Sequence, residues 1–341
     1  MVGFVSLLAV SWTTAGASTT RARKPPRTTT TTSSTTTTSS TTTSSTTTTT
    51  TTVPPGGGGP TIGGCSVFPS NNPWNTDISA APLHPNSSAF ISNILANGSG
   101  GFLHADFGGG GAYGIPYITV GASQPTVPIN FTAYGDESDP GPYPVPLNAP
   151  IEGGSQSNGD RHVLGVDTAH CKLYEMYRAF PRTDHWDADS GAVFDLGSNT
   201  LRPDYWTSAD AAGLPITPGL ARYDEVAAGV IRHALRFTVS ATQRGFIHPA
   251  THFASSSTDP NRPPMGLRLR LKASFDLSSY HGEARVVLDA LKRYGMILAD
   301  NGSNFFITGA ADPRWDDNDL NQLKLVPGSA FEAVDTGPII H

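Results

Sequence analysis

The chain has 341 residues, of which 37% are hydrophobic, 15% charged and 9% aromatic, and it contains 36 Gly and 28 Pro. This composition excludes a coiled coil or helical bundle, which needs far more Ala, Glu, Lys and Leu, and no apolar run is long enough for a polytopic membrane protein. The formal net charge is −6; residues 1–60 carry four basic residues and no acid, so the rest holds 18 basic against 28 acidic residues. An acidic globular part argues against nucleic-acid binding.

The first sixty residues have the pattern of an export signal followed by a stalk. A short apolar stretch, Phe4 to Val10, precedes the small residues Ala15-Gly16-Ala17, which predicts a signal peptide over 1–17, although no Lys or Arg comes before it. Residues 28–52 are only Thr and Ser. Such a segment buries too little to offset its ordering entropy. We therefore expect a Thr/Ser/Pro/Gly-rich stalk over 18–60 and an extracellular protein, free or associated with a cell wall.

Residues 61–341 are expected to form one β-rich domain. Pro and Gly interrupt the chain every eight to twelve residues and leave short runs of strand-forming residues. Many short strands with few helices predict an all-β fold, a β-sandwich or jelly roll with two or three short helices, in a monomer. The expected strands are Tyr117–Val120, His162–Val166, Lys172–Arg178, Val193–Leu196, Ala234–Val239, Gly266–Leu271, Met296–Leu298 and Phe305–Ile307.

Apolar residues at helical spacing predict helices over 87–96 and 283–294, the second ending before Gly295. A capping-box pattern at Thr207–Asp210 predicts the start of a third, short helix. Leu298 to Ile307 is interpreted as strand, Asn-Gly turn and strand, which would place Asp300 at a strand end as an acid, base or ligand.

One hairpin can be aligned residue by residue. If Asp167 faces Lys172, then His162 lies opposite Tyr177, and Glu175 shares their face because side chains alternate along a strand. A His, a carboxylate and a phenol on one sheet face are suited to acid–base chemistry, and ordinary polar pairing on a solvent face is the alternative.

Other polar groups provide further candidates, each with a structural alternative. His104 and Asp106 are two apart and can point the same way, Glu152 lies among glycines, and Asp160 and Arg161 directly precede the hairpin. His233 and Arg236 lie in a predicted strand, where a buried, hydrogen-bonded His is the ordinary outcome. His252 lies in a loop after His248-Pro249.

The acidic turn at 136–139 lacks the spacing of a calcium loop. Four tryptophans lie in loop-like contexts where they could stack on sugars or cover the core: Trp74, Trp186, Trp206 and Trp315.

The remaining motifs exclude several function classes. There is no nucleophile elbow, Walker loop, dinucleotide fingerprint or Cys-rich metal motif, so we expect neither a cofactor nor a metal. Two cysteines, Cys65 and Cys171, are too few for a disulfide scaffold or a Cys-ligated zinc site. A single bridge between the start of the domain and the hairpin is expected if the chain is exported.

Seven segments, taken together, carry a family resemblance. They are Asn72-Pro-Trp-Asn75, Leu103-His-Ala-Asp-Phe107, Ala149-Pro-Ile-Glu-Gly-Gly154, Asp160-Arg-His162, Ser208-Ala-Asp-Ala-Ala-Gly-Leu-Pro215, His233-Ala-Leu-Arg-Phe-Thr238 and Tyr294-Gly-Met-Ile-Leu-Ala-Asp-Asn-Gly-Ser303. The set resembles a family of secreted bacterial proteins of unassigned activity and covers nearly all of the chain from about Cys65 onward. The resemblance implies one module of conserved size behind a variable exported N-terminus, and it implies no activity.

We therefore expect a secreted enzyme that acts on a polysaccharide or cell-wall glycan. In a glycoside hydrolase, Glu175 with Asp160, Glu152 or Asp300 would supply the acid and the base or nucleophile. In a polysaccharide lyase, His162 or His233 with Tyr177 would move the proton, while Arg161 or Arg236 neutralises a uronate; His104, Asp106 and His252 would contact substrate. The alternatives are a non-catalytic glycan-binding or adhesion module and, third, a metal site that uses two or three of His104, His162, His233 and His252.

Overall fold

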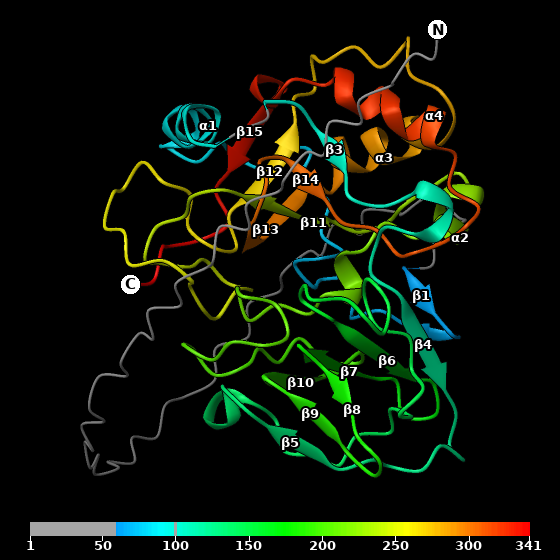
Figure 1. Ribbon diagram of the computed structural model, residues 1–341. Helices are drawn as coiled ribbons and strands as arrows, with labels where there is room; N and C mark the ends of the chain where they lie inside the picture. The colour runs from blue at the N-terminus through cyan, green and yellow to red at the C-terminus, as the bar shows by residue number, and fades with distance from the viewer. Residues whose placement is uncertain (1–58, 99–100) are drawn as a thin grey trace, which may run out of the picture.

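The computed structural model describes residues 59–98 and 101–341, so the predicted signal peptide and nearly all of the predicted stalk lie outside the described residues. Over this range the chain forms many short strands and few helices, which confirms the β-rich class expected from the sequence (Figure 1). None of the helices in these two ranges has the length and apolar character needed to cross a membrane.

Residues 117–195 form two sheets in the lower part of Figure 1. The larger has the strand order β10-β7-β6-β4, in which β4 runs parallel to β6 and the other pairs are antiparallel; the smaller has the order β5-β9-β8. Apolar side chains that include Val163, Met176 and Trp186 form one buried cluster, so the two sheets share a core. The strands are β4 (Tyr117–Val120), β5 (Ile129–Phe131), β6 (Val163–Asp167), β7 (Lys172–Tyr177), β8 (Phe180–Pro181), β9 (Trp186–Ala188) and β10 (Ser190–Asp195).

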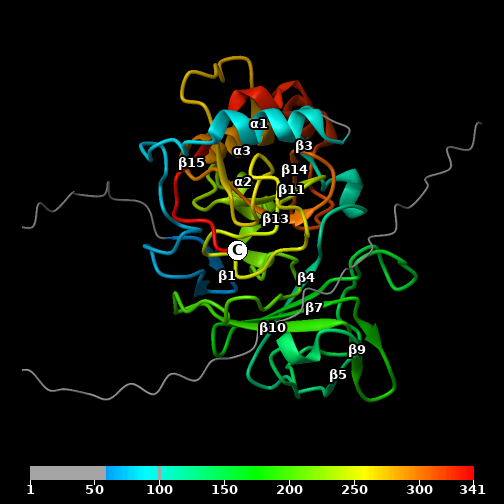
Figure 2. The same ribbon diagram turned by 90° about the vertical axis from the view of Figure 1, so that its left-hand side faces the viewer.

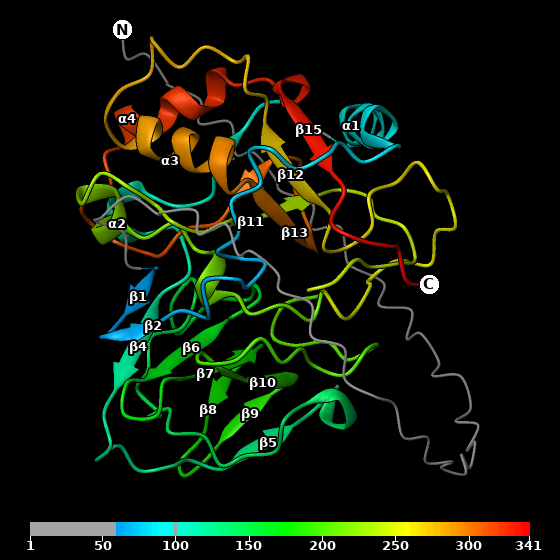
Figure 3. The same cartoon turned by 180° about the vertical axis from the view of Figure 1, so that it is seen from behind.

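A six-stranded mixed sheet forms the upper part, in the order β15-β12-β13-β11-β14-β3 (Figures 1 and 3). Helix α1 (Ser87–Ala96) packs against β15, α3 (Gly282–Arg293) against β12, and α4 (Asp317–Asn321) against α3. The buried faces of α1 and α3 carry the apolar residues whose spacing predicts them. The strands are β3 (His104–Ala105), β11 (Leu235–Val239), β12 (Arg268–Leu271), β13 (Met296–Asn301), β14 (Phe306–Ile307) and β15 (Phe331–Val334).

Figure 2 shows the two groups of strands one above the other. The chain passes between them through residues 196–234, which include the 3-10 turn η3 (Thr217–Gly219) and helix α2 (Tyr223–Ala227). The backbone of this connection bonds to both groups: Ile216 N–H donates to the Glu175 carboxylate of β7, and Ala212 N–H donates to the Ala299 carbonyl of β13. We call the region where the two groups of strands meet along this connection the junction.

The strand and helix expectations are met in most places. Each of the eight expected strands overlaps a strand of the structure, and α1 has its expected bounds. The expected third helix at 207–210 is wrong: Ser208 Oγ donates to the Leu214 carbonyl, and Asp210 N–H donates back to Ser208 Oγ, so the capping-type residues close a turn instead of a helix. The structure adds α2 and α4, which the sequence analysis does not predict.

The Asn-Gly turn connects two strands that do not pair with each other. Strand β11 lies between β13 and β14, parallel to the first and antiparallel to the second. The chain therefore crosses the end of β11, where Gly302 N–H donates to the Val239 carbonyl and Ser240 N–H to Asn304 Oδ1. The predicted strand–turn–strand unit is therefore not a hairpin: the chain crosses over β11 between β13 and β14.

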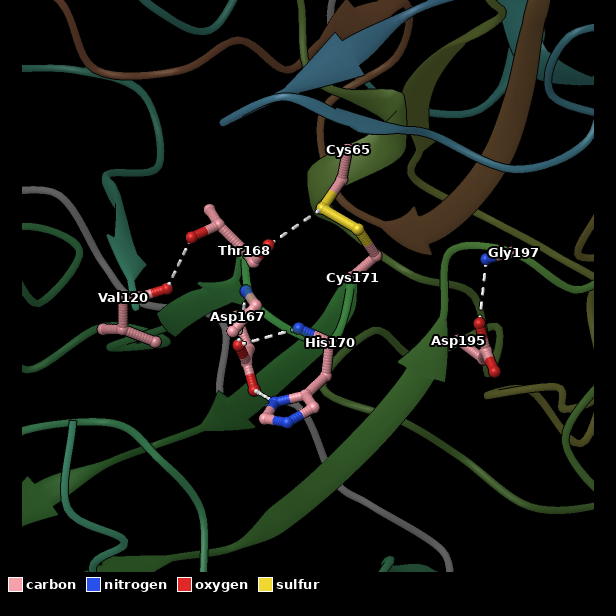
Figure 4. Close-up of a disulfide and its surroundings, with 9 residues drawn as sticks. Cys65, Val120, Asp167, Thr168, His170, Cys171, Asp195 and Gly197 are labelled. Carbon is pink, nitrogen blue, oxygen red and sulfur yellow. Dashed lines mark hydrogen bonds and ion pairs between the residues drawn. A yellow bond between two sulfur atoms is a disulfide. The ribbon is translucent and has the colours of Figure 1, made fainter. Parts of the chain in front are cut away.

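Cys65 and Cys171 form the expected single disulfide (Figure 4). It joins the short ribbon of β1 (Thr61–Ile62) and β2 (Cys65–Ser66) to the turn between β6 and β7. Asp167 accepts hydrogen bonds from the backbone N–H groups of Ala169 and His170, which shapes this turn. The bridge fixes the start of the described chain to the hairpin across a sequence separation of 106 residues.

Candidate functional site

Charged residues from both groups of strands gather at the junction. The open end of the β6–β7 hairpin brings His162 and Tyr177 to this place, and β11 and β13 bring Arg236 and Asp300. Electrostatic interactions connect all of them with loop carboxylates on both sides. We call this set the junction cluster; its members are Asp106, Glu152, Asp160, His162, Tyr177, Asp210, Arg236 and Asp300.

The most buried part of the junction cluster is an ion pair between Arg236 and Asp210. The Arg236 Nε donates to Asp210 Oδ2 at 3.2 Å, and Nη2 donates to Asp210 Oδ1 at 3.0 Å, while Nη1 donates to Thr308 Oγ1 at 2.7 Å. Only 5% of the Arg236 side chain and none of the Asp210 side chain is exposed. Burial alone would lower the pKa of Arg236, but the Asp210 carboxylate raises it, so the guanidinium stays charged.

A β-bulge places Asp300 beside this pair. Phe237 pairs with Leu298, but the next residue, Thr238, pairs with Asp300, so Ala299 is an extra residue on β13. Without the bulge, Asp300 would share the face of Leu298, which is fully buried, because alternate residues of a strand point the same way. With it, Asp300 shares the face of Thr238 and Arg236, where its carboxyl interacts with Arg236 and Asp210.

His162 and Glu152 form a second pair on the opposite side of the junction. His162 Nδ1 lies 2.6 Å from Glu152 Oε2, and Nε2 lies 3.0 Å from the Ala209 carbonyl. Because both ring nitrogens face acceptors, the ring carries two N–H donors and a positive charge. Burial opposes this charge, but the Glu152 carboxylate outweighs it and raises the pKa of His162 to about 9. The hairpin register is as expected, and the His162 ring lies 5.7 Å from the Tyr177 ring.

Asp106 and Asp160 are the two carboxyl groups of the cluster that are exposed to solvent. Asp106 follows β3 and is fixed by its backbone N–H, which donates to the Ile307 carbonyl. Asp160 interacts electrostatically with His162, Tyr177 and Asp300. In the part of the chain that the structure describes, the Asp106 and Asp160 carboxylates accept no hydrogen bond. These two side chains are therefore available to a bound molecule.

The environment drives the carboxyl pKa values of the cluster apart. Desolvation, followed by repulsion from Asp210, raises the pKa of Asp300 to about 7. Desolvation and the Glu152 charge also raise the pKa of Asp106. Burial opposes ionisation of Glu152, yet the His162 charge and hydrogen bonds lower its pKa below the ordinary value. A partly exposed carboxylic acid and a carboxylate therefore coexist in one cluster near neutral pH.

Two of the expected site residues have structural roles instead. Glu175 is fully buried, and its carboxylate accepts hydrogen bonds from the backbone N–H of Ile216 at 2.8 Å, the backbone N–H of Thr217 at 2.9 Å and Thr217 Oγ1 at 2.7 Å. It therefore anchors the start of η3. Arg161 is also buried and donates to the carbonyls of Ala179, Ser155 and Ser157, so it ties the loop before β6 to the hairpin.

The other expected histidines lie outside the cluster or at its margin. His233 is fully buried, with Nε2 3.0 Å from Glu225 Oε2 and Nδ1 2.8 Å from the Ala234 carbonyl. His252 Nδ1 lies 2.8 Å from the Ala211 carbonyl, next to Asp210 in sequence. His104 interacts electrostatically with Asp106 and stacks on Phe306 at 4.1 Å; burial, followed by the charge of Lys324, lowers its pKa.

Neither a metal site nor a row of exposed tryptophans is found. Over residues 59–98 and 101–341, no group of three or more His, Cys, Asp or Glu side chains is arranged to hold a metal ion, so the expected histidines form no three-ligand site. The acidic turn at 136–139 instead binds Arg202, which donates to the Asp139 carboxylate. Of the four tryptophans singled out, Trp74, Trp186 and Trp315 are buried and cannot stack on a sugar, while Trp206 is half-buried with the Arg202 guanidinium 5.7 Å from its ring.

The sequence analysis missed Asp210 as a site residue, and it missed Thr308, the other side chain that accepts a hydrogen bond from Arg236. Asp210 lies in a segment of small residues and Pro whose polar members suggest helix capping, and this local pattern hides its partner 26 residues away. An Arg at an otherwise apolar strand position is expected to be buried, and a buried charge needs a counter-ion. Asp210, the acid of the 207–215 segment, could have been chosen as that counter-ion from the sequence.

A scan against protein-family models, a search of curated proteins and a search of solved structures found no match to this chain. The family resemblance carried by the seven motifs therefore stays a prediction. The candidate function rests on the geometry and electrostatics of the junction cluster.

Proposed function

We propose that the chain is a secreted glycoside hydrolase whose acid and base are Asp300 and Glu152. The observation that carries this proposal is the coexistence, in one partly exposed cluster, of a carboxyl group with a pKa of about 7 and a carboxylate whose pKa is lowered. Two carboxyl groups with pKa values driven apart by their surroundings are the recurring arrangement for acid–base cleavage of glycosidic bonds.

In this mechanism Asp300 is the protonated acid. It donates its proton to the glycosidic oxygen as the bond to the anomeric carbon breaks, so the leaving sugar departs as an alcohol. The Glu152 carboxylate either takes a proton from the water that attacks the anomeric carbon or attacks that carbon itself, after which water hydrolyses the glycosyl ester. His162 keeps Glu152 ionised, and Arg236 compensates the charge left on Asp300.

The lyase alternative has less support. A lyase needs a neutral base and a cation free to bind a uronate. His162 has both ring nitrogens bonded, and so does His233, while desolvation and then the Asp160 charge raise the pKa of Tyr177 to about 12. Arg161 and Arg236 are buried and bonded to protein groups.

Export and the finer architecture are part of the same proposal. The disulfide supports an oxidising, extracellular setting, since such bridges persist outside the cytosol. The core shared by the four-stranded and three-stranded sheets supports a small β-sandwich within the β-rich fold. A glycan polymer is the proposed partner of the junction cluster.

The full chain should be tested against soluble plant, fungal and bacterial polysaccharides, measuring new reducing ends and, in parallel, ultraviolet absorbance from unsaturated uronates. Reducing ends without absorbance, lost in both Asp300→Asn and Glu152→Gln, support the hydrolase. The matched control is Asp184→Asn, which neutralises a carboxylate that is 85% exposed and lies outside the cluster. Absorbance together with reducing ends would identify a lyase, and unchanged rates in both cluster variants would refute the site.

A further inference from the structure

The balance of charge at the junction constrains what can bind there. Five carboxyl groups belong to the cluster, those of Asp106, Glu152, Asp160, Asp210 and Asp300, against the two cations His162 and Arg236. The carboxyl groups most open to solvent, Asp106 and Asp160, accept no hydrogen bond within the described residues. The face that a substrate meets is therefore acidic.

Only 4% of Arg236 and 3% of His162 is exposed, so both cations of the cluster are largely shielded from an anionic substituent. Arg236 lies beneath the acids, with Nε, Nη1 and Nη2 each donating to Asp210 or Thr308. His162 has one ring nitrogen at Glu152 and the other at the Ala209 carbonyl. A uronate or sulfate at the junction would lose its hydration and meet carboxylates without gaining an ion pair.

Two exposed cations reach the margin of the cluster. Arg178 acts on Tyr177 and lies 3.5 Å from its partner Asp189, and Lys324 acts on His104. Neither cation is among the charges that act on Asp106 or Asp300. Even with both included, the five carboxyl groups of the cluster outnumber the four cations.

We propose that the junction cluster takes uncharged or positively charged glycan segments and rejects polymers that carry uronate or sulfate groups, with Asp106 and Asp160 imposing this selection. The inference rests on the proposed function, since it names the substrate class of the same site. Like charges brought together at a binding face act mainly as a barrier to the wrong partner. The barrier should weaken as salt screens the exposed charges.

The test compares one polymer in two charge states. The neutral polysaccharide cleaved fastest in the panel is assayed beside its own carboxymethylated derivative, using the full chain and the variant Asp106→Asn/Asp160→Asn. The rate on the neutral polymer should exceed the rate on the derivative, and the ratio of the two rates should fall by about tenfold in the variant. Raising the ionic strength should lower the ratio for the unaltered chain and leave that of the variant nearly unchanged.

A second double variant separates site charge from overall charge. Asp184→Asn/Asp289→Asn removes the same number of negative charges at exposed positions outside the cluster, and its rate ratio should equal that of the unaltered chain. Faster cleavage of the carboxymethylated polymer, or equal ratio changes in both double variants, would overturn the inference and leave the hydrolase intact. Absence of cleavage on every polymer would overturn the proposed function and this inference with it.

Discussion

Replacing Arg236 by Met should destabilise the protein strongly, because it leaves a buried carboxylate without its counter-ion. The Asp210 side chain is fully buried and receives two of the three guanidinium hydrogen bonds, at 3.0 and 3.2 Å. Removing one partner of such a pair costs about 3–5 kcal/mol. For a domain of this size each kcal/mol shifts the melting temperature by about 2–4 °C, so a loss on the order of 10 °C is expected.

The double variant Asp210→Asn/Arg236→Met removes both charges and should recover a large part of this loss. The exposed pair of Arg182 and Asp187 provides the matched control: Arg182→Met also deletes a bonded guanidinium, but 51% of that side chain is exposed, so about 0–1 kcal/mol is expected. Urea denaturation followed by near-ultraviolet circular dichroism gives the free energies of unfolding. A loss below about 1 kcal/mol in Arg236→Met, or equal losses in Arg236→Met and the double variant, would refute the reasoning.

Three further predictions concern single features. Glu175→Gln should lower the free energy of unfolding by about 1–3 kcal/mol, because an amide cannot accept all three hydrogen bonds, while the specific activity of the folded protein is retained; loss of activity in folded protein would return Glu175 to the catalytic candidates. Cys65→Ala/Cys171→Ala should cost about 4–5 kcal/mol by the chain-entropy model for a 106-residue separation, and reductant should destabilise the unaltered protein but not the variant. Asp300→Asn should stabilise the protein by roughly 1–2 kcal/mol at pH 8 and much less at pH 4, since a carboxyl whose pKa is raised to about 7 in the folded state loses stability as the pH rises from about 4, its unfolded pKa, to about 7, and regains none above that; the gain is below the full linkage value because Asp300 is partly exposed, and a melting temperature that gains equally at both pH values would contradict this.

The sequence predicted local structure well because the local signals are unambiguous. Alternation fixed the register of β6 on β7, and helical spacing fixed α1. The prediction failed where a residue distant in sequence determines the local structure. The polar residues at 207–210 close a turn around Asp210, whose partner is Arg236. Strand β11 separates β13 from β14, so the Asn-Gly turn does not close a hairpin. Period-two patterns cannot show which strands become neighbours.

The same distinction applies to the candidate site. Glu152, Asp160, His162, Arg236 and Asp300 were all singled out by residue type and context, and the structure brings them together. Their roles were not readable, because these depend on burial and on the one-residue bulge that turns Asp300 toward Arg236. A buried carboxylate such as Glu175 has the same sequence signature as a reactive one.

The crossover around β11 has a consequence for how such a site can be inherited. The junction cluster draws on chain segments from Asp106 to Asp300, and β14 takes its place only beside a β11 that already lies next to β13. A fragment that lacks either group of strands therefore lacks part of the cluster. We therefore expect the two groups of strands to be inherited together wherever the junction cluster is kept.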